Sequence, residues 1–311
     1  TIDKKTSESK LGGDLLLARG RVSRLNGHVE TALESFHEAH ESFATLGNAR
    51  SQSIALQSVG SIYNDARSFE RALEYYERAD EIYSDDPSLD ISSANNRANT
   101  LKELGRFDEA LEQFYRALTI SAKIDSSLLE ARILTNLASL QIVMGNLEAA
   151  EQSADDALDL LRGSNDHNWS SFIWGVKAQV AYQRGNIREA EGYLSTVFAD
   201  VDLLQTSAPY RDMHEIAYKI FSTAREGSLA LQHLEAFKRL DDQGRDISAS
   251  ANMALMGARF DFANQNLEIQ QLKTGQLERD INLAEARARQ QKLVLYAVLL
   301  LSLVVTTSIT I

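Results

Sequence analysis

Small and apolar residues recur along most of the chain with a period of about 40 residues. The alanines that mark the six copies are separated by 40, 38, 40, 40 and 40 residues. A period in this range predicts stacked supersecondary units rather than one globular core. The marking alanines are Ala32, Ala72, Ala110, Ala150, Ala190 and Ala230.

The spacing inside each copy predicts two helices joined by a tight turn. Four residues after the first marking alanine comes Phe36, and Ala39 follows three residues later, which places these side chains on one helix face. Upstream, a second periodic segment carries a small residue twelve positions before the alanine in five copies, as at Gly20. Glycine opens four of the turns because it tolerates positive φ, whereas Arg67 and Arg225 stand there in the other two. The predicted unit is a helix-turn-helix.

This pattern resembles the tetratricopeptide repeat in its longer variety of about 40 residues. The resemblance covers residues 11–247, after a polar tail over residues 1–10. It implies an all-α fold, a right-handed superhelical solenoid of about six helix-turn-helix repeats. The last three copies depart from the pattern: Ala154 stands where the fourth should have an aromatic residue, Leu194 and Val197 hold the second-helix positions of the fifth, and Tyr218 occupies the small-residue position of the sixth.

After Gly244 the repeat pattern stops, and residues 248–292 are predicted to form one long helix. A heptad seam runs from Met253 to Gln291, and nine of its twelve core positions are apolar or alanine. Such a seam predicts a coiled-coil stalk that forms a homodimer. The alternative for the part before about residue 265 is a helix that folds back and caps the last repeat.

Residues 293–311 contain no charged side chain and directly follow Arg287, Arg289 and Lys292. Nineteen apolar or uncharged residues are about the length of a membrane-spanning helix, so the sequence predicts a transmembrane helix, truncated by the end of the chain. Basic residues usually mark the cytoplasmic flank of a span. A tail anchor with its repeats facing the cytoplasm is therefore the alternative topology.

The order of array, stalk and span resembles the N-terminal sensor region of bacterial membrane-bound histidine kinases or diguanylate cyclases. The resemblance implies a single-pass protein of the bacterial inner membrane with periplasmic repeats, acting as the sensory and dimerising input of a signal-transduction protein. The alternative is a tail-anchored scaffold that recruits client proteins and has no output domain. Because the chain begins at Thr1 rather than methionine, we expect a fragment or processed form, with any catalytic output beyond residue 311.

Composition narrows the choice of partner. The chain has a net charge of −12, and residues 1–247 carry 26 basic against 39 acidic side chains. This acidic balance argues against a nucleic-acid partner. The absence of cysteine removes disulfides and thiolate metal sites from consideration.

No catalytic motif occurs in the sequence. It lacks a glycine-rich phosphate loop, a His-Glu-x-x-His pair and a nucleophile elbow, so we expect neither an enzyme nor a cofactor. His37 and His40 lie one helical turn apart and could supply two metal ligands. Surface histidines are much more common than such half-sites, so no metal site is predicted.

Function is therefore expected on the concave side of the array, which the first helices of successive repeats line. Asn96 and Asn136 stand two positions before the small residue of the third and fourth copies, and their amides can donate to and accept from a peptide backbone. The alternative is that these asparagines bond water or the next helix. The predicted peptide-binding residues are Asn64, Asn95, Asn96, Asn99, Lys102, Arg132, Thr135, Asn136 and Ser139.

Overall fold

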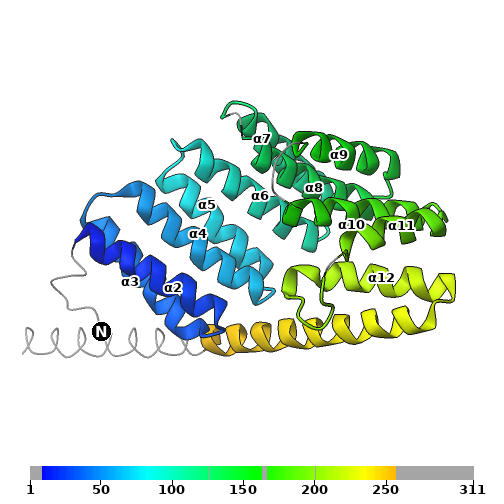
Figure 1. The fold of residues 1–311 in the computed structure, drawn as a ribbon. Helices are drawn as coiled ribbons and strands as arrows, with labels where there is room; N and C mark the ends of the chain where they lie inside the picture. Colours follow the sequence, from blue (N-terminus) through cyan, green and yellow to red (C-terminus); the bar gives the residue numbers. More distant parts are fainter. Residues whose placement is uncertain (1–8, 125, 163–166, 200, 257–311) are drawn as a thin grey trace, which may run out of the picture. The chain divides into compact units, whose positions relative to one another are not determined.

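The computed structural model describes residues 9–124, 126–162, 167–199 and 201–256, which form antiparallel helix pairs (Figure 1). The first helices of the pairs are α2 (Lys10–Leu25), α4 (Ala49–Asp65), α6 (Pro87–Glu103), α8 (Ser127–Val143), α10 (His167–Gln183) and α12 (Arg211–Ala224). The second helices are α3 (Val29–Thr45), α5 (Phe69–Ile82), α7 (Phe107–Ser121), α9 (Leu147–Leu160), α11 (Ile187–Val197) and a helix over residues 227–256. A short 3-10 helix, η1 (Ala208–Tyr210), precedes α12.

Within a pair, the two helices approach most closely where a small residue of the first faces an aromatic ring of the second. A Cβ atom added at Gly20 would lie 2.5 Å from Cε1 of Phe36, and one added at Gly60 would lie 2.7 Å from Cε1 of Tyr76. Both rings are almost fully buried. The same position is held by a fully buried alanine in the next three repeats, at Ala98, Ala138 and Ala178.

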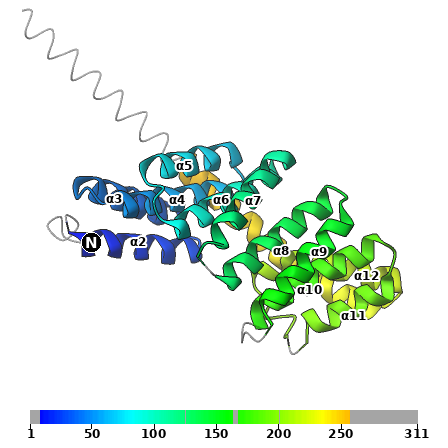
Figure 2. The ribbon, with the colours of Figure 1, turned by 90° about the horizontal axis from the view of Figure 1, so that it is seen from above.

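Neighbouring pairs stack so that each first helix packs on the second helix of the pair before it. The first helices also contact one another in order, from α2 and α4 through to α10 and α12. In the view of Figure 2 the pairs follow one another as a row of antiparallel hairpins. The observed array of helix pairs agrees with the predicted repeat solenoid, and one face of it is made by first helices only.

All six turns inside the pairs use the left-handed backbone conformation at the same position. The φ angles there are 79° at Gly145, 56° at Arg67 and 67° at Arg225, with Gly27, Gly105 and Gly185 similar. The two arginines thus occupy a conformation that costs a residue with a Cβ atom about 1 kcal/mol or more. The turn geometry is required by the repeat, whichever residue stands in it.

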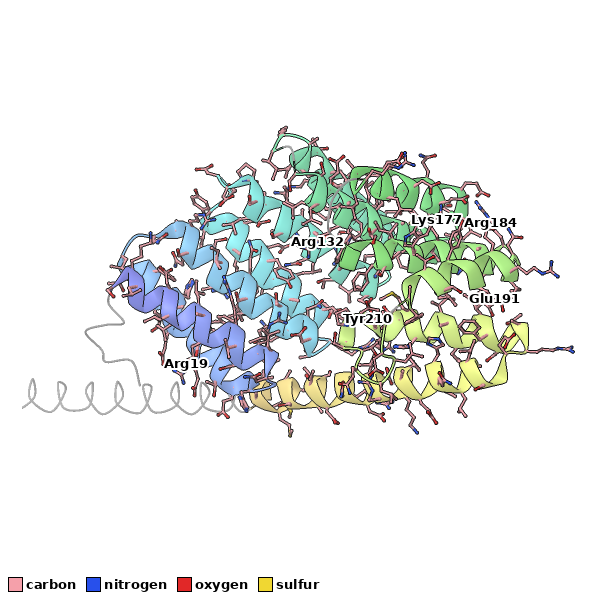
Figure 3. All side chains as sticks on the ribbon, in the orientation of Figure 1. Arg19, Arg132, Lys177, Arg184, Glu191 and Tyr210 are labelled. Atoms are coloured by element: carbon pink, nitrogen blue, oxygen red, sulfur yellow. The ribbon has the colours of Figure 1, made fainter. Side chains whose placement is uncertain are left out.

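Ion pairs join neighbouring repeats along the surface, and Figure 3 labels one of their members, Arg184. Arg24 of the first repeat pairs with Asp65 of the second at 2.6 Å, and Arg184 of the fifth pairs with Glu151 of the fourth at 2.5 Å. Burial raises the pKa of Asp65, and the Arg24 guanidinium opposes that shift. Exposed pairs of this kind contribute little stability, so apolar packing supplies most of it.

The helix over residues 227–256 packs on α12 and then reaches back to the second repeat. It buries Ala230, Ala236 and Leu240, and Arg211 of α12 pairs with Asp241 at 2.6 Å. Farther along, Asn252 Nδ2 donates to the backbone oxygen of Ala66, 186 residues away in the chain, at 3.1 Å. The helix runs unbroken across the predicted boundary at residue 247.

The chain divides into two compact units, Thr1–Ala254 and Leu255–Ile311, and of the second unit only residues 255 and 256 are described. Most of the predicted stalk 248–292 and all of the predicted span 293–311 therefore lie outside the described residues. Among the helices that are described, none combines the length and apolar character needed to cross a membrane. This finding contradicts the predicted transmembrane helix and the inner-membrane localisation, which are not carried further, and the long stalk is likewise unsupported.

A buried histidine pair fixes the last helix to α12. His214 is fully buried and His233 is 3% exposed, and their Nδ1 atoms lie 2.8 Å apart, so one ring donates and the other accepts. His214 Nε2 lies 2.9 Å from Thr206 Oγ1, which also accepts from Arg239 at 2.9 Å and donates to the Leu203 oxygen at 3.0 Å. These bonds tie the loop before η1 to both helices.

Burial, together with the neighbouring His233 and Arg239, lowers the pKa of His214 to about 4. Burial alone lowers the pKa of His233 to about 4. Since the pair is buried and the two Nδ1 atoms share one proton, both imidazoles are neutral in the folded state. An additional proton on either ring would be buried beside the cationic Arg239.

We expect replacement of Gly145 by Ala to lower the free energy of unfolding by about 1 kcal/mol. No atom lies within 4 Å of the added methyl group, so the cost comes from the backbone conformation alone. Gly192→Ala is the matched control, because Gly192 is an exposed α11 residue with equally open space around it. Gly192→Ala should raise the free energy of unfolding by roughly 0.5–1 kcal/mol, because alanine favours a helix more than glycine does. Urea titrations of both variants measure these changes. Equal effects of both changes would contradict the turn assignment.

We expect the melting temperature to fall as the pH drops from about 6.5 toward 4. His214 and His233 have an ordinary pKa of 6.5 in the unfolded chain and a pKa of about 4 in the folded state, so in this range the unfolded chain binds protons and the folded protein does not. The stabilisation is complete above the unfolded pKa and is lost on acidification. Thermal melts of the wild type and of His233→Gln, followed by circular dichroism across this range, measure it. The difference in melting temperature between the wild type and His233→Gln should decrease as the pH falls. A constant gap would show that the pair is not held neutral.

Candidate functional site

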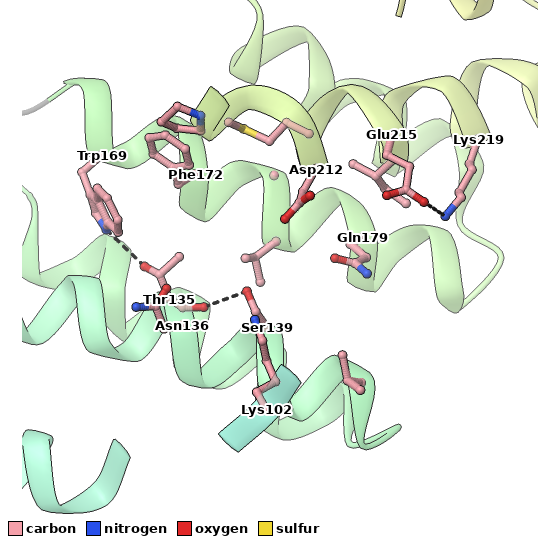
Figure 4. A pocket seen from close by; sticks show the side chains of 16 residues that line it. Lys102, Thr135, Asn136, Ser139, Trp169, Phe172, Gln179, Asp212, Glu215 and Lys219 are labelled. Carbon is pink, nitrogen blue, oxygen red and sulfur yellow. Dashed lines mark hydrogen bonds and ion pairs between the residues drawn. The ribbon is translucent and has the colours of Figure 1, made fainter. Parts of the chain in front are cut away.

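A cavity of about 400 Å³ lies among the first helices of the last four repeats (Figure 4). Because first helices lie side by side along one face of the array, residues far apart in sequence meet there. The lining comes from α6 (Lys102), α8 (Thr135, Asn136, Ser139, Val143), α10 (Trp169, Phe172, Gly175, Val176, Gln179), η1 (Pro209) and α12 (Asp212, Met213, Glu215, Ile216, Lys219).

The α8 side of the cavity is polar and internally hydrogen bonded. Thr135 Oγ1 donates to the Ala131 oxygen at 2.7 Å and accepts from Trp169 Nε1 at 3.3 Å. Ser139 Oγ donates to the Thr135 oxygen at 3.1 Å, as Figure 4 shows. Asn136 Nδ2 donates to Asn95 Oδ1 on α6 at 2.9 Å, and this bond leaves the other polar groups of the Asn136 amide for a ligand.

Aromatic and apolar side chains of α10 and α12 form the other side of the cavity. The rings of Trp169 and Phe172 lie with their centres 5.0 Å apart, and Tyr210 stands 5.8 Å beyond Phe172. A Cβ atom at Gly175 would lie 3.0 Å from Cγ of Met213, so glycine here lets α12 come close to α10. This part of the cavity can accept an apolar side chain.

Opposite charges line different parts of the cavity. On α12, Glu215 pairs with Lys219 at 2.7 Å, and Asp212 pairs with the adjacent Arg211 at 2.6 Å. On α6, the Nζ atom of Lys102 lies 3.9 Å from Glu103, and no other acidic side chain among the residues that the structure describes lies within pairing distance of it. Lys102 is therefore the more weakly neutralised charge and the better partner for a carboxylate of a ligand.

Two smaller hollows continue the face toward the amino end of the array. One of about 270 Å³ is lined by Asn64, Arg67, Phe69, Asn99, Lys102 and Glu103. The other, of about 230 Å³, is lined by Arg21, Ile54, Gln57, Ser58, Ser61, Leu89, Ser92 and Asn96. Lys102 belongs both to the first of these and to the main cavity.

The predicted peptide-binding residues separate into three groups. Lys102, Thr135, Asn136 and Ser139 meet at the main cavity. Asn64 and Asn99 line one of the smaller hollows together with Lys102, and Asn96 lines the other. The remaining two contact the site indirectly: Asn95 accepts from Asn136, and the Arg132 guanidinium lies 4.9 Å from the centre of the Trp169 ring. Ligand binding by these residues stays a prediction.

Several of the asparagines also join helices, as the alternative interpretation expected. Asn136 bonds Asn95 of the preceding repeat, and Asn64 Oδ1 accepts from Thr100 Oγ1 of the next repeat at 3.0 Å. Asn99 differs from these two, because its Nδ2 donates within α6 to the Asn95 backbone oxygen at 2.9 Å. Part of the predicted amide ladder is therefore used in holding neighbouring first helices together.

Sequence reasoning missed the contribution of α10 and α12. It followed the third and fourth copies, where asparagines stood out. Trp174 of the fifth copy stacks on Tyr193, with ring centres 5.5 Å apart. The same phase applied to the fifth copy points to Val176, two positions before Ala178, and Val176 lines the cavity. Val176 could therefore have been predicted from the sequence, whereas the approach of α12 to the cavity could not.

The histidines offer little for metal binding within the described part of the chain. His40 Nε2 lies 3.4 Å from Gln52 Nε2, and burial lowers the pKa of both His37 and His40. No group of three or more histidine or acidic residues that could hold a metal ion occurs among the residues that the structure describes.

Residues 90–163 match the family model described as Tetratricopeptide repeat, and residues 27–125 match a Domain of Unknown Function (DUF3856). No curated protein matches the chain. The match identifies tetratricopeptide repeats over residues 90–163, and the helix pairs on either side of this segment have the same arrangement. Such a repeat fold is consistent with a protein-binding module.

Several solved structures have the same fold. The apo form of RapI is 16% identical, with 79% of this chain and 84% of that chain aligned at a TM-score of 0.58. Aspartyl phosphate phosphatase F from Bacillus subtilis is 18% identical, with 78% and 73% covered at 0.58. A Rap protein complexed with competence and sporulation factor is 12% identical, with 76% and 77% covered at 0.57. These matches do not support the resemblance to kinase or cyclase sensor regions.

We expect Asn136→Ala to lower the free energy of unfolding by about 1 kcal/mol, because it removes the bond to Asn95 on the neighbouring helix. Asn96→Ala is the matched control: it holds the equivalent position one repeat earlier, and its side-chain amide has no hydrogen-bond partner among the described residues. The control should unfold within about 0.5 kcal/mol of the wild type. Indistinguishable urea midpoints for the two variants would contradict a structural role for Asn136.

Proposed function

We propose that this chain is a protein- or peptide-binding module and that its ligand is an extended segment held along the first-helix face. The observation that carries the proposal is the main cavity, which joins hydrogen-bonding side chains of α8 to aromatic and apolar side chains of α10 and α12. An extended segment presents both kinds of group, since its backbone is polar and its side chains alternate in direction.

The dimensions favour one anchored side chain with hydrogen bonds beside it. A volume of about 400 Å³ lies at the small end of the range for ligand sites. The apolar part near Phe172 and Met213 would take the side chain, while Asn136 and Gln179 would bond the adjacent backbone. The smaller hollows around Asn96 and Asn99 extend the same face and would take neighbouring residues of the segment.

The charge of the chain sets the general character of the ligand. With a net charge of −12, the protein attracts segments that are neutral or basic overall. Lys102 is a local exception, because its weakly paired ammonium group faces the cavity and suits a single carboxylate. A structural neighbour at 12% identity, the Rap protein complexed with competence and sporulation factor, shows that this fold can carry a bound factor in that protein.

The proposal is tested by selecting peptides from a phage-displayed random library on the immobilised full chain. Affinities of enriched peptides are then measured by calorimetry. Val143→Arg places a long cationic side chain at the cavity, and since Val143 is 57% exposed the fold should tolerate it. We expect the affinity to fall by about tenfold or more.

Leu204→Arg is the matched control, because Leu204 is a 75% exposed apolar residue that does not line the cavity. Its affinity should equal that of the wild type. Failure to enrich any peptide, or equal affinities for Val143→Arg and the wild type, would overturn the assignment of the cavity as the binding site.

A further inference from the structure

The 227–256 helix continues beyond its partner α12 and reaches the second repeat. Residues 241–254 of this helix are called the strap below. At one end of the strap, Asp241 accepts from Arg211 of α12 at 2.6 Å. Near the other end, Asn252 Nδ2 donates to the backbone oxygen of Ala66 at 3.1 Å. Figure 1 shows this helix, coloured yellow to orange, running from α12 toward α2 and α4.

The strap docks on the turn between α4 and α5 by polar and by apolar contact. Ala66 is the C-cap residue of α4, where the backbone oxygens have no partner within the helix, so the Asn252 amide satisfies one of them. Ala251 is fully buried, although Ala249 and Asn252 on either side of it are exposed. Because a helix by itself cannot bury one of its own side chains completely, another part of the protein covers Ala251.

Charge also draws the strap toward this turn. The hydrogen bond from Arg211 holds the pKa of Asp241 below its ordinary value, and the positive charges of Arg245 and Arg67 act in the same direction. Arg67 stands in the turn itself, at the position with positive φ. The second repeat therefore attracts the strap through a turn residue that is glycine in four other copies.

Between its two ends the strap is exposed to solvent. Residues 242–247 are all exposed, and Arg245 pairs with Asp241 and Asp242 of the same helix. Gly244 lies in the middle of this stretch, and no atom lies within 4 Å of a Cβ atom added to it. Glycine weakens the interior of a helix relative to alanine. The helix is therefore weakest at Gly244, between the part that packs on α12 and the part that docks on the second repeat.

The strap adds a contact that the repeats by themselves do not make. In a solenoid each repeat contacts its neighbours, so small changes at successive interfaces add up to a change in curvature. The strap joins the sixth repeat to the second, and repeats two to six thus form a closed loop of contacting elements. In Figure 1, α7 and α9 lie on the outer side of this loop. The main cavity is lined by four successive first helices, so its width follows the curvature.

We propose that the strap docks reversibly on the turn between α4 and α5 and sets the curvature of the array. Docked, it holds repeats two to six at one curvature; when the helix opens at Gly244, the strap leaves Ala66 and the array can widen. The occupant of this docking surface is a segment of the chain itself. The strap lines none of the three cavities described above, and its docking does not depend on the binding function proposed there.

Hydrogen exchange of the full chain, read by mass spectrometry, tests the docking. Once undocked, residues 245–254 are a short isolated helix, which is unstable in water, so their amides exchange in the open form. Ala251→Glu places a charge in a buried position and should speed this exchange by about tenfold or more. Ala249→Glu is the matched control at an exposed position, and its exchange should stay within about twofold of the wild type. Equal exchange in the two variants would overturn the docking.

A second pair of variants tests the opening at Gly244. Gly244→Ala should slow the exchange of residues 245–254 by about fivefold, since alanine stabilises the interior of the helix. Gly227→Ala makes the same change at the start of the same helix, also in open space, and should leave the exchange of the strap unchanged. If both substitutions slowed the exchange equally, or if neither did, the assignment of Gly244 as the opening point would be wrong.

The curvature itself can be measured because the chain has no cysteine. Spin labels on Glu81→Cys in the second repeat and Arg188→Cys in the fifth occupy exposed positions, and pulsed electron double resonance gives the distance between them. With Ala251→Glu the distance distribution should become broader than in the wild type, whereas with Ala249→Glu it should not. Identical distributions for these two variants would refute control of the curvature by the strap, whatever the outcome of the peptide selection.

Discussion

The structure depends on one recurring constraint, the close approach of the two helices within each repeat. Gly20 lies against Phe36 and Gly60 against Tyr76, at separations that a Cβ atom would not permit. Burial of an aromatic side chain contributes on the order of 2–3 kcal/mol, so these contacts stabilise the close approach of the helices in the first two pairs. In the next three pairs a fully buried alanine, Ala98, Ala138 or Ala178, holds the same position. Stacking of equal pairs then places the first helices along one face, which is the condition for the groove.

The chemical character of the first-helix face, which carries the main cavity and the smaller hollows, follows from this arrangement. The same side of successive first helices forms this face, so equivalent positions of the repeats contribute: Asn96 in the third, Asn136 in the fourth and Val176 in the fifth. The side chains thus change from amide to aliphatic along the array. A ligand that runs across the repeats meets hydrogen-bonding groups first and the aromatic cluster of Trp169 and Phe172 later.

The two ends of the array differ for a physical reason. Every internal pair is covered on both sides, whereas a terminal pair exposes the face that its neighbour would cover. The 227–256 helix, the second helix of the sixth pair, is tied to α12 by the His214 and His233 pair and to the second repeat by the Asn252 bond to Ala66. On α2, Leu15 and Val22 remain exposed, whereas the equivalent positions of the later first helices are buried.

The repeat array was predictable because its signals are local: a period of about 40 residues, small residues opposite aromatic ones, and turn residues at one position. Apolar content alone could not decide the role of residues 293–311, since length and hydropathy describe a helix that could span a membrane without showing that one does. Only the α6 and α8 side of the site could be predicted, because the position of a residue within the repeat shows which side of the helix it occupies. Only the tertiary structure brings η1 and α12 against α10, turns Asn136 toward Asn95, and buries His214 beside His233, since these contacts depend on how distant segments pack.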